Sequence, residues 1–173
     1  MTGTLVVAII ALAVSSSTLT WQVLQFLLSS SRPKVYLGLG AVRGNQLASG
    51  RLGVARIDDL LTQGFDTPVA TVRVHNRGRM AVSVTSWGID FRGGMGLSNL
   101  GHSANDHSPL PHRLDPGAEA QWVLPLQDVH ALLDGMRDLG RAPSQCRARI
   151  GLGTGKTQYG KWISVEEWSA TGK

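Results

Sequence analysis

The sequence predicts a mainly β protein, in which an N-terminal transmembrane helix precedes an antiparallel β-sandwich with one short inserted helix. Three observations support this. Residues 5–28 contain no charged side chain. After residue 31, short segments alternate apolar and polar residues and are separated by Gly, Pro and Asn. One segment near residue 130 changes to a helical period. We therefore divide the chain into an anchor helix (1–31), a β-sandwich domain (32–167) and a tail (168–173).

The N-terminal segment Leu5–Leu28 is long enough to cross a bilayer. At about 1.5 Å per residue its 24 residues span roughly 36 Å, against a hydrocarbon core of about 30 Å. Thirteen of these residues are Leu, Ile, Val or Phe, which favours insertion. No Lys or Arg precedes the segment, so a permanent signal anchor is favoured over a cleaved signal peptide. Cleavage after Ala13 and burial as a soluble helix are the alternatives.

One side of this helix is polar. At 100° per residue, a stripe about 80° wide collects small and hydrogen-bonding side chains. The stripe consists of Ala11, Ser15, Thr18, Gln22, Gln25 and Ser29. Such residues allow close approach and hydrogen bonding between helices in lipid, which predicts a homo-oligomer or a membrane partner. Alternatively, the hydroxyl groups bond to their own helix and the two glutamines reach toward the interface.

The charge distribution predicts an orientation. The net charge of +5 lies entirely after the helix, and Arg32, Lys34 and Arg43 follow it closely as candidate membrane-surface residues. The positive-inside rule then predicts an outer N-terminus and a cytoplasmic domain at the inner membrane of a bacterial-type cell. The cations form no run, so a basic surface beside anionic lipid is favoured over nucleic acid. Cys146 is the single cysteine and allows no disulfide within the chain.

The soluble part is expected to contain six or seven strands. Alternation predicts strands at 34–42, 68–76, 80–91, 120–124, 145–152 and 159–165. In the third strand the apolar phase slips, which predicts a β-bulge near Ser86. The turn after Asn76 is expected to use a positive φ at Gly78, and Asp115-Pro116-Gly117 fits a type II turn. Residues 128–139 have a helical period, whereas 43–63 are ambiguous between strand and helix.

This pattern indicates an Ig-like or fibronectin-like sandwich. The Asn76-Arg77-Gly78 turn between two strands, the Leu114-Asp115-Pro116-Gly117 turn and the closing hairpin resemble those of uncharacterised bacterial single-pass membrane proteins with one small Ig-like sandwich. The resemblance covers roughly Pro33 to Val165. It implies a fold and no activity, and the missing cysteine pair distinguishes the domain from antibody-type domains.

Two segments resemble a phosphate-binding loop and a metal site, but each departs from the known motif. The segment 151–157 (GLGTGKT) looks like a phosphate loop, but the required glycine is replaced by Ile150 and a strand pattern follows. A hairpin turn is therefore predicted. The second motif is a group of metal-ligand residue types in the 93–112 loop. It contains His102, Asp106, His107 and His112, whose spacing fits no recognised metal site.

The predicted function is a membrane-anchored, non-enzymatic interaction module. No nucleophile elbow is present, so hydrolase chemistry is not supported. No enzyme activity, cofactor or metal is predicted. The five Trp residues are dispersed and do not alternate with basic clusters, which argues against nucleic acid binding. Expected partners are membrane lipid and a protein, or a second copy, packed on the helix. One alternative is a phage-type or envelope protein that oligomerises through its helix and acts on the membrane, and another is a ligand- or metal-binding domain that uses the 93–112 loop.

Overall fold

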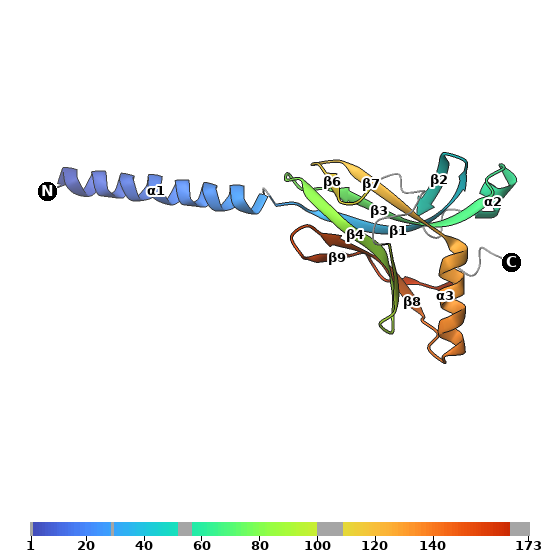
Figure 1. Ribbon diagram of the computed structural model, residues 1–173. Helices are drawn as coiled ribbons and strands as arrows, with labels where there is room; N and C mark the ends of the chain where they lie inside the picture. The colour runs from blue at the N-terminus through green and yellow to red at the C-terminus, as the bar shows by residue number, and fades with distance from the viewer. Residues whose placement is uncertain (1, 29, 52–56, 100–108, 167–173) are drawn as a thin grey trace.

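The computed structural model describes residues 2–28, 30–51, 57–99 and 109–166. A long helix extends from one end of a two-sheet β domain (Figure 1). The helices are α1 (Thr2–Leu28), α2 (Ile57–Thr62) and α3 (Leu126–Asp138). The strands are β1 (Pro33–Arg43), β2 (Gln46–Arg51), β3 (Thr67–Asn76), β4 (Val82–Phe91), β5 (Gly96–Asn99), β6 (His112–Leu114), β7 (Glu119–Pro125), β8 (Gln145–Leu152), β9 (Thr157–Tyr159) and β10 (Ile163–Ser164).

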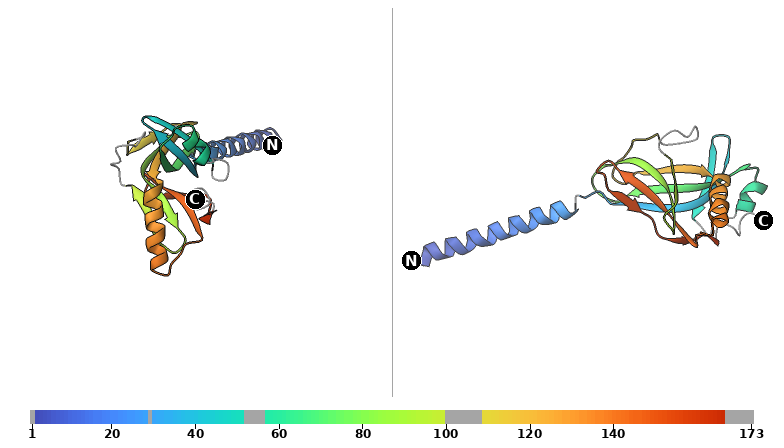
Figure 2. Two further views of the ribbon diagram at one scale, coloured as in Figure 1. Left: turned by 90° about the vertical axis from the view of Figure 1, so that its right-hand side faces the viewer. Right: turned by 60° about the horizontal axis from the view of Figure 1, so that its bottom comes forward.

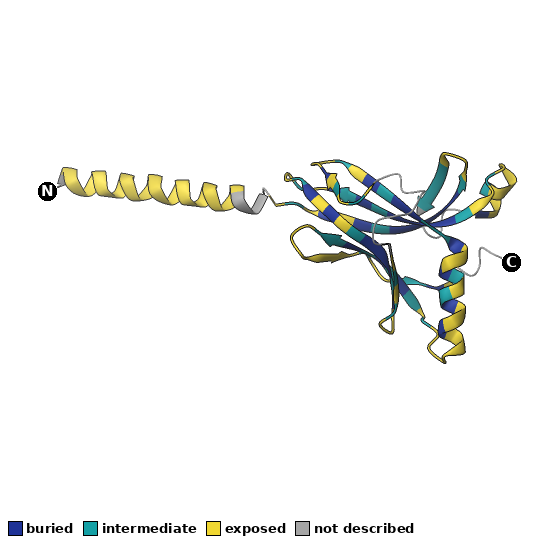
Figure 3. Ribbon diagram, viewed as in Figure 1, coloured by how far each residue is buried: buried dark blue, intermediate teal, exposed yellow. Residues whose placement is uncertain are grey.

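Helix α1 is long and apolar enough to cross a membrane over the 23 residues Gly3–Gln25. None of its described side chains is buried against the domain (Figure 3). Leu5, Leu12 and Leu19 are each more than 60% exposed, although they are the residue type most favoured in a hydrocarbon environment. The helix therefore has the length and surface of an anchor.

The β domain consists of two antiparallel sheets. The first has the strand order β2-β1-β3-β7, and the second has the order β10-β8-β4-β5, with β6 also paired to β4 and β9 to β8. A shift in register between Val84 and Ser86, where β4 pairs with β8, confirms the predicted bulge. The bulge adds one residue to β4, so that Trp87, Ile89 and Phe91 face the core like the earlier Val82 and Val84.

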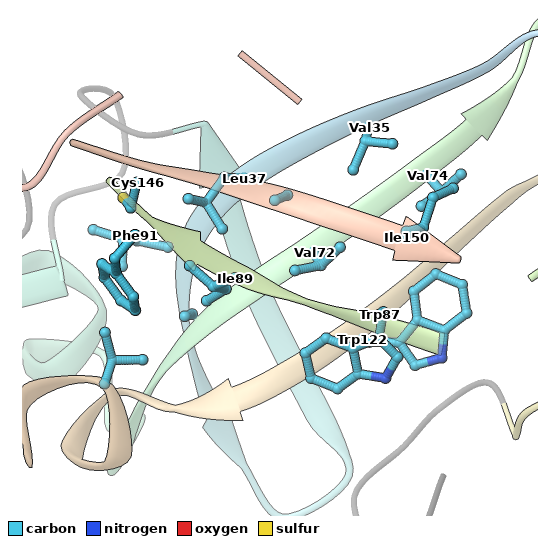
Figure 4. Packing of buried hydrophobic residues seen from close by; sticks show 14 of the residues in the cluster. Val35, Leu37, Val72, Val74, Trp87, Ile89, Phe91, Trp122, Cys146 and Ile150 are labelled. Carbon is cyan, nitrogen blue, oxygen red and sulfur yellow. The ribbon is translucent and has the colours of Figure 1, made fainter. Parts of the chain in front are cut away.

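One hydrophobic cluster fills the space between the sheets. In this cluster, Trp87 of β4 and Trp122 of β7 stack with ring centroids 6.4 Å apart, and both are at most 1% exposed (Figure 4). Alternate residues of β1, β3 and β8 reach the same cluster, as predicted. Helix α3 contributes Val129, Leu133 and Met136 from the end of the domain farther from α1 (Figure 2).

The described residues of the ambiguous segment 43–63 form β2 and α2. Strand β2 pairs with β1 at the edge of the first sheet and bends over the outer face of that sheet. Gly38 and Gly40 permit this approach, because a Cβ atom at Gly38 would lie 2.5 Å from the carbonyl oxygen of Gly50. The Ser49 hydroxyl lies 3.0 Å from Arg73 Nη2 and 2.9 Å from Gln121 Nε2, and both groups donate to it. Thr71 lies on the face of β3 opposite the core residues Ala70 and Val72, and it is only 2% exposed because β2 covers it.

The predicted final strand 159–165 is divided into β9 and β10. Tyr159 pairs with Arg149 and the Gly160 amide donates to Ala148, whereas Ile163 pairs with Cys146. From Gly160 to Ile163 the chain advances three residues, while the opposing β8 advances two, from Ala148 to Cys146. One extra residue on one strand is the definition of a β-bulge. The extra residue interrupts the alternation that the sequence pattern suggested.

Candidate membrane-proximal site

The segment between α1 and β1 is bonded to the turn between β3 and β4. The Arg77 amide donates to the carbonyl oxygen of Arg32 at 3.1 Å, and the Arg79 amide donates to that of Ser30 at 3.3 Å. These bonds continue the β1 and β3 pairing, which starts at Pro33 opposite Asn76. The chain that leaves the anchor is therefore held by the domain.

Asn76, the last residue of β3, is 0% exposed and connects four segments. Its Nδ2 donates to the carbonyl oxygens of Met80 at 2.8 Å and Leu114 at 3.1 Å. Its Oδ1 accepts from the amides of Gly78 at 3.0 Å and Arg32 at 3.3 Å. We call this set of four bonds the Asn76 clamp. A buried amide side chain that uses both donors and both acceptor positions is fully satisfied and fixes its surroundings.

Gly78 has a different role from the one predicted. It is absent from the glycines with positive φ among the described residues, so the turn does not need a left-handed backbone here. The requirement is space, because a Cβ atom would lie 2.5 Å from the Arg32 nitrogen and 2.6 Å from the Ser31 Cα. Only a residue without a side chain lets the juxtamembrane segment cross the turn this closely.

Cations collect at this end of the domain. The segments 30–34, 77–81 and 153–156 contain no acidic residue. Their cations, which we call the basic end, are Arg32, Lys34, Arg77, Arg79 and Lys156, all of them exposed. The hairpin that carries Lys156 belongs to the same region because the Gly153 amide donates to the carbonyl oxygen of Ser83, near the start of β4. The adjoining turn contributes Asp115, which is ion-paired with Arg113 at 3.1 Å.

Arg43 lies elsewhere, which separates it from Arg32 and Lys34. It ends the 11-residue strand β1, so at about 3.3 Å per residue it is roughly 33 Å from the start of that strand. Its guanidinium lies 5.8 Å from the Phe65 ring centroid and donates to the carbonyl oxygen of Gln63. Arg43 was predicted to lie at the membrane surface because it is close to the anchor in sequence. The extended strand β1 places it at the end of the domain farther from the anchor.

The polar stripe of α1 is exposed at Ala11, Ser15, Thr18, Gln22 and Gln25, while Ser29 lies outside the described residues. The hydroxyl groups of Ser15 and Thr18 donate to the carbonyl oxygens four residues earlier, at 2.8 and 2.9 Å. These bonds are the ones expected if the hydroxyl groups of the stripe bond to their own helix and not to a second helix. Gln22 and Gln25 are the exposed residues of the stripe that carry amide donors.

The other sequence motifs are placed as follows. Residues 151–157 form the β8–β9 hairpin, closed by a 2.9 Å bond from the Leu152 amide to the carbonyl oxygen of Lys156, which confirms the predicted turn. His102, Asp106 and His107 lie outside the described residues. His112 begins β6 and contacts Trp122 edge-on, with ring centroids 6.0 Å apart. Within the described ranges, no group of three His, Cys, Asp or Glu side chains is placed to hold a metal.

Comparisons with known proteins assign no family. No family model matches the chain, and no curated protein matches it. One similar solved structure is described as "X-ray structure of Northeast Structural Genomics Consortium target SoR45". It has 12% sequence identity and a TM-score of 0.31, and the match covers 79% of this chain and 86% of that one.

Sequence reasoning did not find the Asn76 clamp, although a signal was present. An Asn-Arg-Gly turn directly after the clearest strand suggested only a reversal of the chain. The bonds of Asn76 reach Arg32 and Leu114, which are 44 and 38 residues away. Contacts at such separations arise from strand pairing and cannot be read from local spacing.

Proposed function

We propose that this chain is a membrane-anchored, non-enzymatic interaction module that holds a β domain against the inner face of a bacterial-type membrane. The Asn76 clamp is the observation that carries the proposal. Only residues 29–32 separate α1 from β1, and four residues span at most about 14 Å. Because the clamp bonds this segment to the domain, a membrane-spanning α1 would keep the basic end beside the lipid headgroups.

The charges of the basic end support a cytoplasmic location. Each Lys or Arg near an anionic leaflet contributes about 1 kcal/mol of attraction. Arg77, Arg79 and Lys156 are far from Arg32 in sequence, yet they add to the same positively charged flank of the helix. The positive-inside rule then favours an outer N-terminus and an inner domain. Membrane lipid is accordingly one proposed partner.

The order of the strands supports an Ig-like fold for the module. One sheet contains β1, β3 and β7 as neighbours, and the other places β8 between β4 and the pair β9 and β10. This is the neighbour order of strands A, B and E and of strands C, F and G in Ig-like domains. The buried Trp87 on β4 occupies the strand that carries the core Trp of such domains.

Cysteine labelling tests the anchor and its orientation together. In spheroplasts, a membrane-impermeant maleimide should label a Thr2→Cys variant and should label a Thr154→Cys variant only after the membrane is opened. The native Cys146 is 0% exposed, so the wild-type chain provides the unlabelled control. Labelling of Thr154→Cys in closed spheroplasts would show that the β domain faces outward, contrary to the proposed orientation. If opened membranes yield no labelled full-length Thr2→Cys band, a permanent anchor is contradicted.

Association through α1 is a second candidate function, favoured by the exposed amides of Gln22 and Gln25. Each hydrogen bond between helices in lipid is worth about 0.6 to 2 kcal/mol. Replacing both glutamines with leucine should therefore weaken association in a membrane two-hybrid assay roughly tenfold. The matched control is the Ser17→Leu, Thr20→Leu double variant, which changes the opposite side of the helix. An equal signal from wild type and the glutamine variant would rule out this interface.

A further inference from the structure

The outer face of the second sheet contains a pocket lined by charged residues, separate from the basic end. Its volume is about 450 Å³, and it lies between the β4–β5 hairpin and Trp162. Among the residues that the structure describes, the charged ones lining it are Asp90, Arg92, Arg147 and Arg149. Three arginines and one aspartate leave a formal charge of +2 (3 − 1) around the pocket. This excess is concentrated on the neighbouring strands β4 and β8.

Arg147 is held in a fixed plane but has weak polar contacts. Its guanidinium lies 3.8 Å from the ring centroid of Tyr159 and 4.3 Å from that of Trp162. The bulge between β9 and β10 allows both rings to reach the same arginine. Among the described residues its buried Nε has no hydrogen-bond partner, and the Asp90 carboxylate is 3.9 Å from Nη2. A guanidinium that two stacked rings hold in place, and whose described carboxylate partner is 3.9 Å away, is suited to an incoming anion.

Arg149 and Arg92 complete the positively charged lining. Arg149 Nε lies 3.3 Å from Asp90 Oδ1, and its Nη2 donates to the Ser98 hydroxyl. Arg92 Nη1 donates to Gln145 Oε1 at 2.5 Å. Within the described part of the chain, Asp90 is thus the carboxylate placed between Arg147 and Arg149. An added carboxylate would share these arginines with Asp90 and would use donors that Asp90 reaches only at long distance.

The position of the pocket indicates that its ligand comes from the aqueous side. Asp90 is eight residues beyond Val82 along β4, which places it about 26 Å from the basic end. Lipid charge is screened over about 8 Å at physiological salt, so headgroups are out of reach. Met95 and Trp162 add apolar surface beside the arginines. This combination fits an acidic side chain flanked by an apolar one, as in a protein segment.

We propose that this pocket binds a carboxylate side chain of an acidic segment on a soluble protein partner. Guanidinium groups match carboxylates in a planar, bidentate arrangement. Asp90 would repel the second charge of a phosphate dianion, which favours a carboxylate. The proposal gives the interaction module its class of partner and in that sense rests on the proposed function. The labelling experiment can succeed while peptide binding fails, so the two failures are distinguishable.

Peptide binding to the full-length protein in detergent micelles tests the proposal. The probe is a fluorescein-labelled Gly-Glu-Leu-Glu-Gly peptide followed by fluorescence anisotropy, and the matched peptide carries Gln at both Glu positions. The Gln peptide should bind about tenfold more weakly, and Arg147→Gln should weaken binding of the Glu peptide by about the same factor. Arg137→Gln is the control, because this exposed arginine pairs with Asp134 on α3. Its binding should equal that of wild type.

A second variant gives a change of opposite sign. Asp90→Asn removes the competing carboxylate and should tighten binding of the Glu peptide about threefold or more. This readout decides the question even where Arg147→Gln fails to fold. Equal affinity for the two peptides, weaker binding by Asp90→Asn, or an affinity for inorganic phosphate above that for the Glu peptide would each overturn the proposal.

Discussion

Replacing Asn76 with alanine is expected to lower the free energy of unfolding of the β domain by about 3 kcal/mol. The substitution removes four hydrogen bonds and leaves the carbonyl oxygens of Met80 and Leu114 and the amide of Gly78 without their partner. Buried polar groups without partners cost about 1 to 3 kcal/mol each, and partial access of water reduces the sum. Chemical denaturation of the full-length protein in detergent micelles, followed by Trp fluorescence, measures the change.

The matched control is Asn45→Ala, the same substitution at an exposed position in the β1–β2 turn. It should change the free energy of unfolding by less than about 0.5 kcal/mol, as surface substitutions usually do. Equal stability of the two variants would show that the Asn76 clamp contributes little to the fold. A loss at Asn76 alone supports its role at the junction of anchor and domain.

Replacing Gly78 with alanine is expected to release the juxtamembrane segment from the domain. The added Cβ would lie within 2.6 Å of backbone atoms of Ser31 and Arg32, so that segment has to move away. Its two bonds to the turn are lost, at a cost of about 1 kcal/mol each, together with the bond from the Arg32 amide to Asn76. Amide hydrogen exchange at Arg77 and Arg79 should accelerate about tenfold or more.

Gly135→Ala is the control for this variant. Gly135 lies in α3 with open space around its Cβ position, and alanine favours a helix over glycine by about 0.8 to 1 kcal/mol. The same substitution is therefore expected to stabilise the protein slightly and to leave exchange at Arg77 unchanged. Unchanged exchange in Gly78→Ala would mean that the segment adapts without leaving the turn.

The strands with one face in the core were predictable from the sequence. Alternation has a period of two, and burial of one face makes that period visible in β1, β3 and β8. The bulge in β4 was visible for the same reason, since a slip of one residue would otherwise turn apolar side chains toward solvent. Helix α3 was visible because Val129, Leu133 and Met136 recur at helical spacing.

Segments without a single buried face were not predictable in the same way. Thr71 faces away from the core, and its burial depends on β2, whose position depends on the absence of side chains at Gly38 and Gly40. The final strand was expected to be continuous, and its bulge follows from how Ile163 pairs with Cys146. Neither the burial of Thr71 nor the bulge produces a periodic pattern in the sequence, because each depends on a contact with a residue distant in the sequence.

The candidate sites also differ in how far the sequence predicts them. The sequence alone determined that α1 has the length and apolar character of an anchor and that Arg32 and Lys34 follow it, because these properties belong to contiguous residues. Only the tertiary structure brought Arg77, Arg79 and Lys156 to the same end and carried Arg43 away. Strand pairing decides which distant residues meet, and it depends on the packing of two sheets about one core.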